Sequence, residues 1–351
     1  MTRTARIAHL GLGAFARSHQ AWYTQAASDD WGIMASTSRV TAKLAEQSFR
    51  YSLIERGPEV DSITVIDSVV DVDWNLEDIF SERPEIAILT LTVTEAGYLP
   101  KAFAVRDIAE GLEERRMSGG GPLAIVPCDN VPSNGAVLRD ALLAVANDQL
   151  TKWIIENVSF VSTMVDRITP ATTPTDVNIA SKVLGWYDAI PVVTEPFTEW
   201  VLQGDFPAGR PEWEKAGAQF VDDVEPYEQR KLWMLNGAHS LLAYRGLELG
   251  LETVFEAWVA LAPEVEQLWA EAREVLPLPA ADIDRWLGEL RIRWQNPRIE
   301  HRLTQIAEGG EQKILARIGA VIERRKEAGL PTGTAEFETI AAWERYKERN
   351  K

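Results

Sequence analysis

The sequence contains few of the residues that build disulfide frameworks or metal centres. Cys128 is the only cysteine among 351 residues, so the chain cannot form an internal disulfide or a cysteine-rich zinc site. The four histidines, at positions 9, 19, 239 and 301, show neither an HExxH pattern nor paired spacing. The sequence therefore predicts no metal site, and its cysteine usage is compatible with a reducing cytoplasm.

Long apolar runs and an excess of positive charge are also missing. No run of about 18 apolar residues occurs, and the first residues, MTRTARIAHLGLG, lead into a strand-like segment without a signal peptide. Lys and Arg number 36 against 53 Asp and Glu, which gives a net charge of -17. Nucleic acid and acidic membranes bind clustered positive charge, so neither is an expected partner. We expect a cytoplasmic protein that acts on a small molecule.

The beginning of the chain has a pattern typical of a dinucleotide-binding unit. Residues 6–13, RIAHLGLG, form a short apolar run that ends in glycines, and helix-forming residues follow. The turn reads Gly11-x-Gly13-x-x-Ala16, the fingerprint in its variant with alanine last. The first glycine permits the turn, the second lets the backbone approach a pyrophosphate, and the helix start offers free N–H groups. An ordinary tight strand–helix junction is the alternative interpretation.

The end of the second predicted strand leaves the choice of nucleotide open. That strand is expected at 32–36, GIMAS, and an NAD-binding fold usually has an acidic residue where it ends. Here the sequence continues Thr37, Ser38, Arg39. Arg39 with its hydroxyl neighbours could accept the 2′-phosphate of NADP, but a solvated arginine fits equally well. We expect NAD as the cofactor, with NADP possible.

The remaining pattern predicts two domains. Strands are expected at 86–94 and 123–127 and a helix at 103–117, whereas the chain after 224 is almost wholly helical. Helices are expected there at 256–273, 282–294, 299–306, 312–328 and 335–347. The predicted fold class is an α/β N-terminal Rossmann-type doubly wound sheet followed by a mainly α-helical C-terminal domain. We assign residues 1–200 to the dinucleotide-binding domain and 201–351 to the helical domain, with the boundary near 190–225.

One helix, expected at 225–244, gathers polar side chains of catalytic type. At about 100° per residue, with Lys231 at zero, Glu228 falls near 60°, His239 near 80° and Asn236 near 140°. Four polar side chains therefore converge on one sector of the helix. An amphipathic helix with a buried polar edge, in which His239 is a satisfied core residue, is the alternative.

Gly237 interrupts this helical pattern. A glycine costs a helix roughly 1 kcal/mol relative to alanine. Its presence indicates close approach by another backbone or by a ligand.

Several stretches together resemble the mannitol dehydrogenase family, the polyol-specific long-chain dehydrogenases and reductases. They occur in family order and span most of the chain. The most specific is KLWMLNGAHS, since K-x4-N-x2-H within KLxxLNGxHS is that family's catalytic signature. The matching stretches are HLGLGAFARSHQ (9–20), LTVTEAGY (91–98), CDNVPSNG (128–135), MVDRITPAT (164–172), the long segment 194–228 and KLWMLNGAHS (231–240).

The resemblance implies roles for the polar residues of the helix. It makes Lys231 the general base, Asn236 and His239 the contacts to the reacting oxygen and the substrate, and Glu228 the relay of the proton to solvent. Many members have an asparagine that pairs with Asn236 in an oxyanion hole, where this chain has Ser162. The shorter serine hydroxyl leaves transition-state stabilisation and substrate preference open.

The same resemblance implies a set of cofactor contacts. The loop after the first strand supplies Gly11, Gly13, Ala14 and Phe15, and later strand ends supply Glu95, Asp129 and Asn130. An ordinary Asn/Gly/Pro loop is the alternative interpretation of 128–135. The family also implies a monomer.

The expected chemistry is the oxidation of a secondary alcohol without a metal. A lysine can remove the hydroxyl proton once its pKa is lowered towards neutrality by burial or by nearby cations. A donor fixed on the oxygen stabilises the developing charge, and losing one costs about 3 to 4 kcal/mol. Further polar contacts to a polyol could come from Arg293, Asn296, Arg298, His301 and Lys313, or these could be solvated helix faces.

We therefore expect an NAD(P)-dependent oxidoreductase that interconverts a polyol, mannitol-like or arabinitol-like, and its ketose. A hexuronate reductase, which makes mannonate or altronate, and a sugar-alcohol-phosphate dehydrogenase are alternatives within this chemistry. A non-catalytic cofactor-binding sensor is an alternative of another class. Ser162 motivates that alternative, and the presence of Lys231, Asn236 and His239 together argues against it.

Overall fold

The structure is a computed structural model that describes residues 3–36, 39–73 and 75–350. The chain divides into two compact units after Val224. The N-terminal unit comprises Met1–Arg56 and Val60–Val224, and the C-terminal unit comprises Glu225–Lys351 with the short turn Gly57–Glu59. The division lies at the end of the interval 190–225 in which the sequence places a boundary. Each unit is described separately below.

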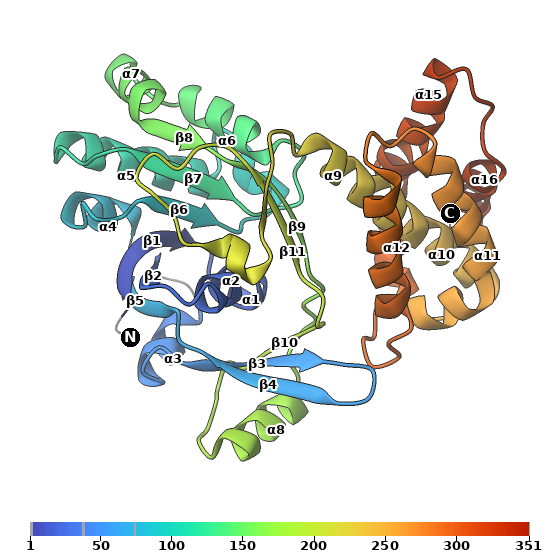
Figure 1. The fold of residues 1–351 in the computed structure, drawn as a ribbon, viewed down its shortest axis with the longest axis horizontal. Coiled ribbons are helices and arrows are strands. Elements are labelled where there is room, and N and C mark those ends of the chain that lie inside the picture. The colour runs from blue at the N-terminus through green and yellow to red at the C-terminus, as the bar shows by residue number, and fades with distance from the viewer. Residues whose placement is uncertain (1–2, 37–38, 74, 351) are drawn as a thin grey trace. The chain divides into compact units, whose positions relative to one another are not determined.

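The N-terminal unit is built on a six-stranded parallel sheet with the strand order β5-β2-β1-β6-β7-β8 (Figure 1). Its strands are β1 (Thr4–Leu10), β2 (Trp31–Ser36), β5 (Val69–Asp73), β6 (Ile88–Leu91), β7 (Leu123–Pro127) and β8 (Val158–Phe160). In chain order this is the 3-2-1-4-5-6 arrangement of dinucleotide-binding folds. The predicted doubly wound sheet is confirmed.

Helices cover both faces of the sheet because the strands are apolar on both sides. Ile7 packs with helices α1 (Ala14–Ser18) and α2 (Gln20–Ala26). The next residue, Ala8, packs on the opposite face. That face is covered by α4 (Leu76–Glu82), α5 (Phe103–Met117), α6 (Asn134–Leu143) and α7 (Asp148–Asn157). Full burial of a side chain such as Ile7 contributes about 1.5–3 kcal/mol, so the two layers stabilise the sheet that carries the site.

Two elements differ from the sequence expectation. The strand expected at 86–94 is only Ile88–Leu91, and a 3₁₀ turn, η1 (Glu95–Tyr98), follows it. The helix after the glycine turn is divided at His19, whose backbone leaves the helical region. The reason is tertiary, since the buried His19 ring hydrogen-bonds the carbonyl of Glu199 and packs edge-to-face against Trp200.

Two three-stranded sheets and two further α-helices also belong to this unit. One sheet has the order β10-β3-β4 and the other β12-β11-β9. The bounds are β3 (Tyr51–Arg56), β4 (Asp61–Ile66), β9 (Ser162–Asp166), β10 (Val192–Thr194), β11 (Glu199–Gln203), β12 (Gln219–Phe220), α3 (Thr41–Glu46) and α8 (Pro174–Leu184). The second sheet begins β9 at Ser162 and thereby fixes the backbone of a predicted site residue.

The C-terminal unit is helical, as predicted. Its elements are α9 (Glu225–Arg230), the π-helix η3 (Lys231–Asn236), α10 (Gly237–Glu248), α11 (Val254–Arg273), α12 (Ala280–Trp294), α13 (Leu303–Ala307), α14 (Gly310–Ile314), a second π-helix η4 (Leu315–Gly319), α15 (Ala320–Glu327) and α16 (Thr334–Arg349). The helix expected at 299–306 begins only at Leu303. The central α10 packs against α11, α13 and α16. Its buried side chains are therefore largely shielded from bulk water.

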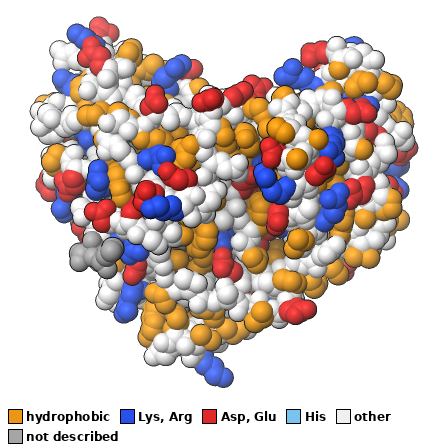
Figure 2. All heavy atoms as spheres, in the orientation of Figure 1, with side chains coloured by type: hydrophobic (Ala, Val, Ile, Leu, Met, Phe, Trp, Pro, Cys, Tyr) orange, Lys and Arg blue, Asp and Glu red, His pale blue; other side chains and the backbone are white. Residues whose placement is uncertain are grey.

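The surface has no organised field of one charge on the face that is shown. Figure 2 shows basic and acidic side chains interspersed with apolar and uncharged ones over that face. Among the helices that the structure describes, each is too short or too polar to span a bilayer.

Candidate active site

The glycine turn lies where the strand order of the parallel sheet reverses. β1 pairs with β2 on one side and with β6 on the other, and ligands of such sheets bind at this switch point. Gly11 has a φ of 90°, and a side-chain carbon there would overlap the carbonyl oxygen of Thr92, the residue after β6. Gly13 is exposed, and the nearest atom outside its chain neighbours, Gly11 O, lies 3.8 Å from the position its side-chain carbon would take. The first glycine is therefore required by the fold, and the second leaves space for a ligand.

A buried histidine supports this turn from below. His9 Nδ1 lies 2.8 Å from Thr90 Oγ1, and its Nε2 lies 3.4 Å from Thr92 Oγ1. Thr92 Oγ1 in turn donates to the carbonyl of Gly11 at 2.6 Å. Burial lowers the pKa of His9 to about 4, so the ring is neutral at pH 7. The network joins β1, β6 and the glycine turn without a buried charge.

The other predicted cofactor residues also stand at the carboxyl ends of strands in this unit. Glu95 follows β6 and is exposed, and Asn130 follows β7 and is exposed. Arg39 is exposed after β2, while its neighbours Thr37 and Ser38 lie outside the described residues. Ala14 and Phe15 form the first turn of α1 and pack partly against the core.

Asp129 is half-buried and is hydrogen-bonded to a neighbouring segment. Its Oδ2 accepts a hydrogen bond from the Tyr98 hydroxyl at 2.7 Å, which ties the loop after β7 to η1. Burial raises the pKa of Asp129 from its ordinary value to about 6. This carboxyl group therefore changes its charge slightly below neutral pH, at the edge of the sheet where a nicotinamide dinucleotide would bind.

Ser162 lies at a close junction of two backbone segments. A side-chain carbon on Gly135 would be 2.8 Å from Ser162 N and 2.9 Å from Ser162 Oγ. Asn134 fastens the same junction, since its side chain accepts from Thr163 N at 2.9 Å and donates to Thr163 O at 3.0 Å. The position of Ser162 is therefore fixed by the start of α6.

The lysine helix of the C-terminal unit is not a uniform α-helix. Lys231–Asn236 forms the π-helix η3, and the N–H of Gly237 donates to Leu232 O, five residues earlier. The expected angles assumed α geometry throughout, in which Lys231 and Asn236 are about 140° apart. A turn closed by i→i+5 hydrogen bonds places residues five apart about one turn from each other. The two side chains therefore share a face more closely than the sequence predicted, and the uniform α-helix was wrong.

The carbonyl groups of the π turn find partners on neighbouring helices. Trp269 Nε1, on α11, donates to Met234 O at 2.9 Å. Arg317 Nη1, on η4, donates to Asn236 O at 3.2 Å. Gly237, which the sequence marked for close approach, faces η4 at ordinary contact distance, with Ile318 Cδ1 3.5 Å from its added carbon. A side chain at position 237 would therefore fit without a clash, and the close approach expected at Gly237 is not seen among the described residues.

His239 is buried beside aromatic rings and positive charges. It is 7% exposed, with its ring centroid 5.3 Å from Trp294 and 5.0 Å from His301. Its Nε2 has no hydrogen-bond partner among the described residues. Burial first, and then the electrostatic effects of His301, Arg317 and other nearby cationic groups, hold the pKa of His239 well below its ordinary value. The imidazole is thus neutral and retains an open nitrogen.

Several residues of the proposed polyol-contact set are buried, and others are not. Arg293 is 9% and Asn296 is 6% exposed, so a solvated helix face is the wrong interpretation for these two. Lys313 donates to Ile306 O at 3.2 Å, and Arg298 is exposed. Burial and the charge of Arg293 lower the pKa of His301.

Sequence reasoning missed two residues of the site regions. Arg317 donates a hydrogen bond to Asn236 in η3. No signal in the sequence indicated this contact, because Arg317 is distant in the chain and its surroundings have an ordinary helical pattern. Asp73 ends β5 in register with Ser36 at the end of β2. An acidic residue therefore does stand at that end of the sheet, although it comes from the neighbouring strand. The alternation of Val70 to Asp73 is the signal that could have found it.

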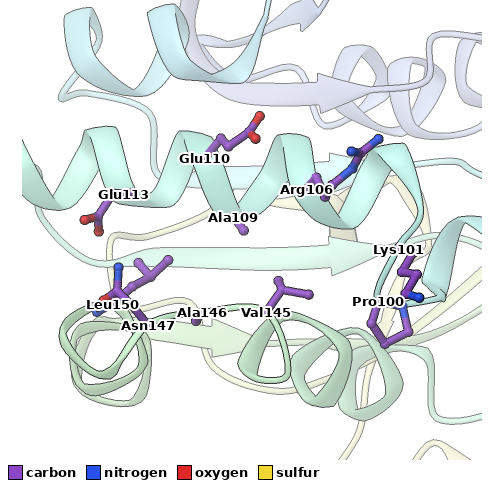
Figure 3. A pocket seen from close by; sticks show the side chains of 10 residues that line it. All are labelled: Pro100, Lys101, Arg106, Ala109, Glu110, Glu113, Val145, Ala146, Asn147 and Leu150. Atoms are coloured by element: carbon purple, nitrogen blue, oxygen red, sulfur yellow. Dashed lines mark hydrogen bonds between the residues drawn. The ribbon is translucent and has the colours of Figure 1, made fainter.

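Two surface hollows of the N-terminal unit do not coincide with these residues. One, of about 610 Å³, lies between α5 and the start of α7, and Arg106 and Glu110 line it from α5 (Figure 3). The other, of about 530 Å³, is lined by residues beside α8, including Arg17 and Tyr187. Neither is lined by the glycine turn. Within the described residues no cluster of three His, Cys, Asp or Glu side chains could hold a metal ion.

A Rossmann-type sheet with a glycine turn at its switch point, followed by a helical unit with a Lys-Asn-His constellation, defines a nicotinamide-dinucleotide dehydrogenase. The family models agree with this class. The mannitol dehydrogenase Rossmann domain matches residues 5–215, and the mannitol dehydrogenase C-terminal domain matches residues 223–351. The chain belongs to the mannitol dehydrogenase family, and the resemblance seen in the sequence is confirmed.

Relatives with names and solved structures support the same assignment. D-mannonate oxidoreductase of Escherichia coli (strain K12) is 36% identical over 98% of this chain and 80% of its own length. The Pseudomonas fluorescens mannitol 2-dehydrogenase ternary complex with NAD and D-mannitol is 34% identical, with a TM-score of 0.80 over 98% of this chain and 79% of that one. A D-sorbitol dehydrogenase in substrate-free form is 28% identical, with a TM-score of 0.89 over 97% and 80% of the two chains.

Proposed function

We propose that this protein is an NAD-dependent oxidoreductase that interconverts a polyol of the mannitol type and its ketose, with Lys231 as the general base. The observation that carries the proposal is the π turn η3, which brings Lys231 and Asn236 onto one face next to the buried, neutral His239. Membership of the mannitol dehydrogenase family supports the same reaction class.

The glycine turn fits the cofactor. Gly11 admits the tight turn, and the open space at Gly13 allows the backbone to approach a pyrophosphate. Asp73 would hydrogen-bond ribose hydroxyls and repel a 2′-phosphate, which favours NAD over NADP, while Arg39 would favour the opposite choice. Glu95, Asp129 and Asn130 would border the bound nucleotide. When bound, NAD supplies the acceptor for the hydride.

The residues of the C-terminal unit would carry the proton chemistry. Lys231 in its neutral form takes the proton from the substrate hydroxyl, and Glu228 relays it to solvent. Asn236 donates to the oxygen as negative charge develops, and Ser162 supplies a second donor. His239, neutral and with Nε2 available, holds the reacting or a neighbouring hydroxyl. No step in this scheme requires a metal ion.

A sugar acid is the second candidate substrate, because the groups around His239 are cationic. Arg293, Arg317 and Lys231 all lower the pKa of His239 electrostatically, so a substrate carboxylate would be attracted to this region. The D-mannonate oxidoreductase relative supports this alternative. It would make the protein a hexuronate reductase.

The experiment that tests the function is an absorbance assay at the reduced-nicotinamide band. Purified protein is mixed with NAD or NADP and with mannitol, arabinitol, sorbitol, mannonate, altronate or mannitol 1-phosphate. Reduction of NAD with one polyol is the expected result. Cofactor binding without turnover of any compound would instead support the sensor alternative.

The base is tested by substitution. Lys231→Ala is expected to abolish turnover while the N-terminal unit still binds NAD, and Lys326→Ala, at an exposed position of α15, is the matched control. Near-normal activity of Lys231→Ala would show that the base is wrongly assigned. We also propose a cytoplasmic monomer, which sedimentation equilibrium and cell fractionation would check.

A further inference from the structure

Two π-helices lie against each other in the C-terminal unit. The first, η3, carries Lys231 and Asn236, and the second, η4, comprises Leu315–Gly319 and contacts it directly. π turns are rare and occur frequently at functional sites. The second π turn has no role in the proposed mechanism, and its contact with the first requires an explanation.

Arg317 provides the link between the two turns. Its Nη1 donates to the backbone carbonyl of Asn236 at 3.2 Å and to Ser240 Oγ at 3.0 Å. Ser240 Oγ itself donates to Asn236 O at 3.2 Å. The carbonyl of Asn236 is thus held by two side-chain donors that also bond to each other.

The burial and charge of Arg317 explain why this hydrogen bond can control the geometry of the π turn. The side chain is half-buried, and burial lowers the pKa of its guanidinium. A guanidinium nevertheless stays protonated in proteins, so a full positive charge lies beside the π turn. Removing the donor would leave the part-buried Asn236 carbonyl with one hydrogen bond fewer, and such losses allow the local backbone to shift. A π turn is vulnerable to such a shift, because a return to α geometry moves Asn236 away from the face of Lys231.

We propose that Arg317 is a positioning residue that holds η3 in its π conformation and thereby keeps Asn236 aligned with Lys231. It acts through the Asn236 carbonyl and touches neither substrate nor cofactor. The inference rests on the proposed function, since it assigns the alignment of two residues whose catalytic roles are themselves proposed.

Arg317→Met is the variant that tests it, because methionine keeps much of the side-chain length and removes the donors. Misplacement of a catalytic group by about 1 Å can cost about a hundredfold in rate, so we expect kcat to fall between about tenfold and a hundredfold. KM for the polyol and the dissociation constant of NAD are expected to change less than about threefold, because ground-state binding is not removed.

Arg325→Met is the matched control within the same unit. Arg325 is buried on α15, donates from Nη1 to the carbonyl Glu271 O at 2.6 Å and pairs with Glu274 and Glu336, so its loss has a structural cost at least as large. We expect a lowered Tm for both variants but a reduced kcat at 25 °C only for Arg317→Met. An equal loss of kcat in both would reduce Arg317 to a purely structural residue and overturn the proposal.

Arg317→Lys tests whether a second cationic donor restores kcat, and it serves as the test variant if Arg317→Met does not fold. Lysine retains the charge and one donor point but not the planar guanidinium, so kcat is expected to lie between that of wild type and that of Arg317→Met. If Arg317→Met does not fold, a kcat of Arg317→Lys within twofold of wild type overturns the proposal, and a lower kcat at unchanged KM supports it. Lys231→Ala is measured beside them. If that variant is active, the proposed function fails, whereas an inactive Lys231→Ala with a fully active Arg317→Met refutes only the role of Arg317.

Discussion

Gly11 and Thr92 are joined by a reciprocal fit at the switch point of the sheet. Thr92 Oγ1 donates to Gly11 O at 2.6 Å, and the Thr92 carbonyl occupies the space that a side chain at position 11 would need. The strand end of β6 and the turn after β1 therefore form one unit. Gly11 is required by the fold and Gly13 leaves space for the cofactor, so substitutions at the two positions should have different effects.

Gly11→Ala and Gly13→Ala are expected to fail differently. Alanine at 11 meets the Thr92 carbonyl and a φ of 90°, so Tm should fall and NAD binding should be lost. Alanine at 13 meets no protein atom within 3.8 Å, so Tm should remain near wild type while NAD binding weakens at least tenfold. Thermal denaturation and quenching of protein fluorescence by NADH measure the two effects.

Gly185→Ala is the control for backbone strain alone. Gly185 ends α8 with a φ of 75°, and nothing lies within 4 Å of its added carbon. The substitution should cost about 1 kcal/mol and leave NAD binding unchanged. Tight NAD binding by Gly13→Ala would contradict the assignment of the second glycine.

Asp129→Asn should raise the stability of the protein at pH 7.5 and weaken its binding of NAD. The pKa of Asp129 is raised to about 6, above the ordinary 3.8, so the folded state binds the proton more tightly than the unfolded state does. Stability from this group is present below about pH 4 and declines as pH rises to 6. The amide can still accept from Tyr98, so the variant should have a higher Tm than wild type at pH 7.5 and an equal one at pH 4.

The same variant should bind NAD more weakly at pH 7.5, because the ionised carboxylate that attracts the cationic nicotinamide is gone. Wild-type affinity should rise with pH through about 6, and the variant should show no such inflection. Asp140→Asn, at an exposed position of α6, should alter neither quantity. A pH-independent affinity in wild type would count against a cofactor role for Asp129.

His9→Gln should reveal the cost of keeping a histidine neutral. The pKa of His9 is lowered from 6.5 to about 4, so the unfolded chain binds a proton in this window that the folded chain does not. Stability therefore rises with pH between about 4 and 6.5, and the difference amounts to roughly 3 kcal/mol. Urea denaturation should show His9→Gln less stable than wild type at pH 7.5, with the gap closing at pH 4.5. A gap independent of pH would contradict the burial of an uncharged ring.

Ser162→Ala and Ser162→Asn test the departure from the family pattern. If the hydroxyl is a donor to the developing oxyanion, alanine should lower kcat about tenfold or more at nearly constant KM. Asparagine restores the family's amide donor and should give a kcat equal to or above that of wild type. Thr163→Ser, one residue along β9, is the control for changes to the strand. Equal kcat values in all four proteins would remove Ser162 from the mechanism.

Local pattern was sufficient for the dinucleotide-binding half of the protein. Glycine spacing after an apolar run, and buried strands alternating with helices, depend on backbone sterics and on burial within about 30 residues. These signals predicted the sheet, the glycine turn and the loops after β6 and β7, in which Glu95 and Asp129 lie. The preference for NAD or NADP could not be predicted in the same way, because Asp73 lies beside the end of β2 only through the pairing of β5 with β2.

The sequence by itself was enough to predict which residues carry the chemistry, because the motif of Lys231, Asn236 and His239 is local and specific. Only the tertiary structure decided how they are presented. Helical periodicity cannot distinguish a π turn from an α-helix over six residues, and η3 depends on partners that are distant in the chain. Trp269 and Arg317 supply those hydrogen bonds from α11 and η4. Burial beside His301 and Arg317, which keeps His239 neutral, likewise arises only when the helices pack.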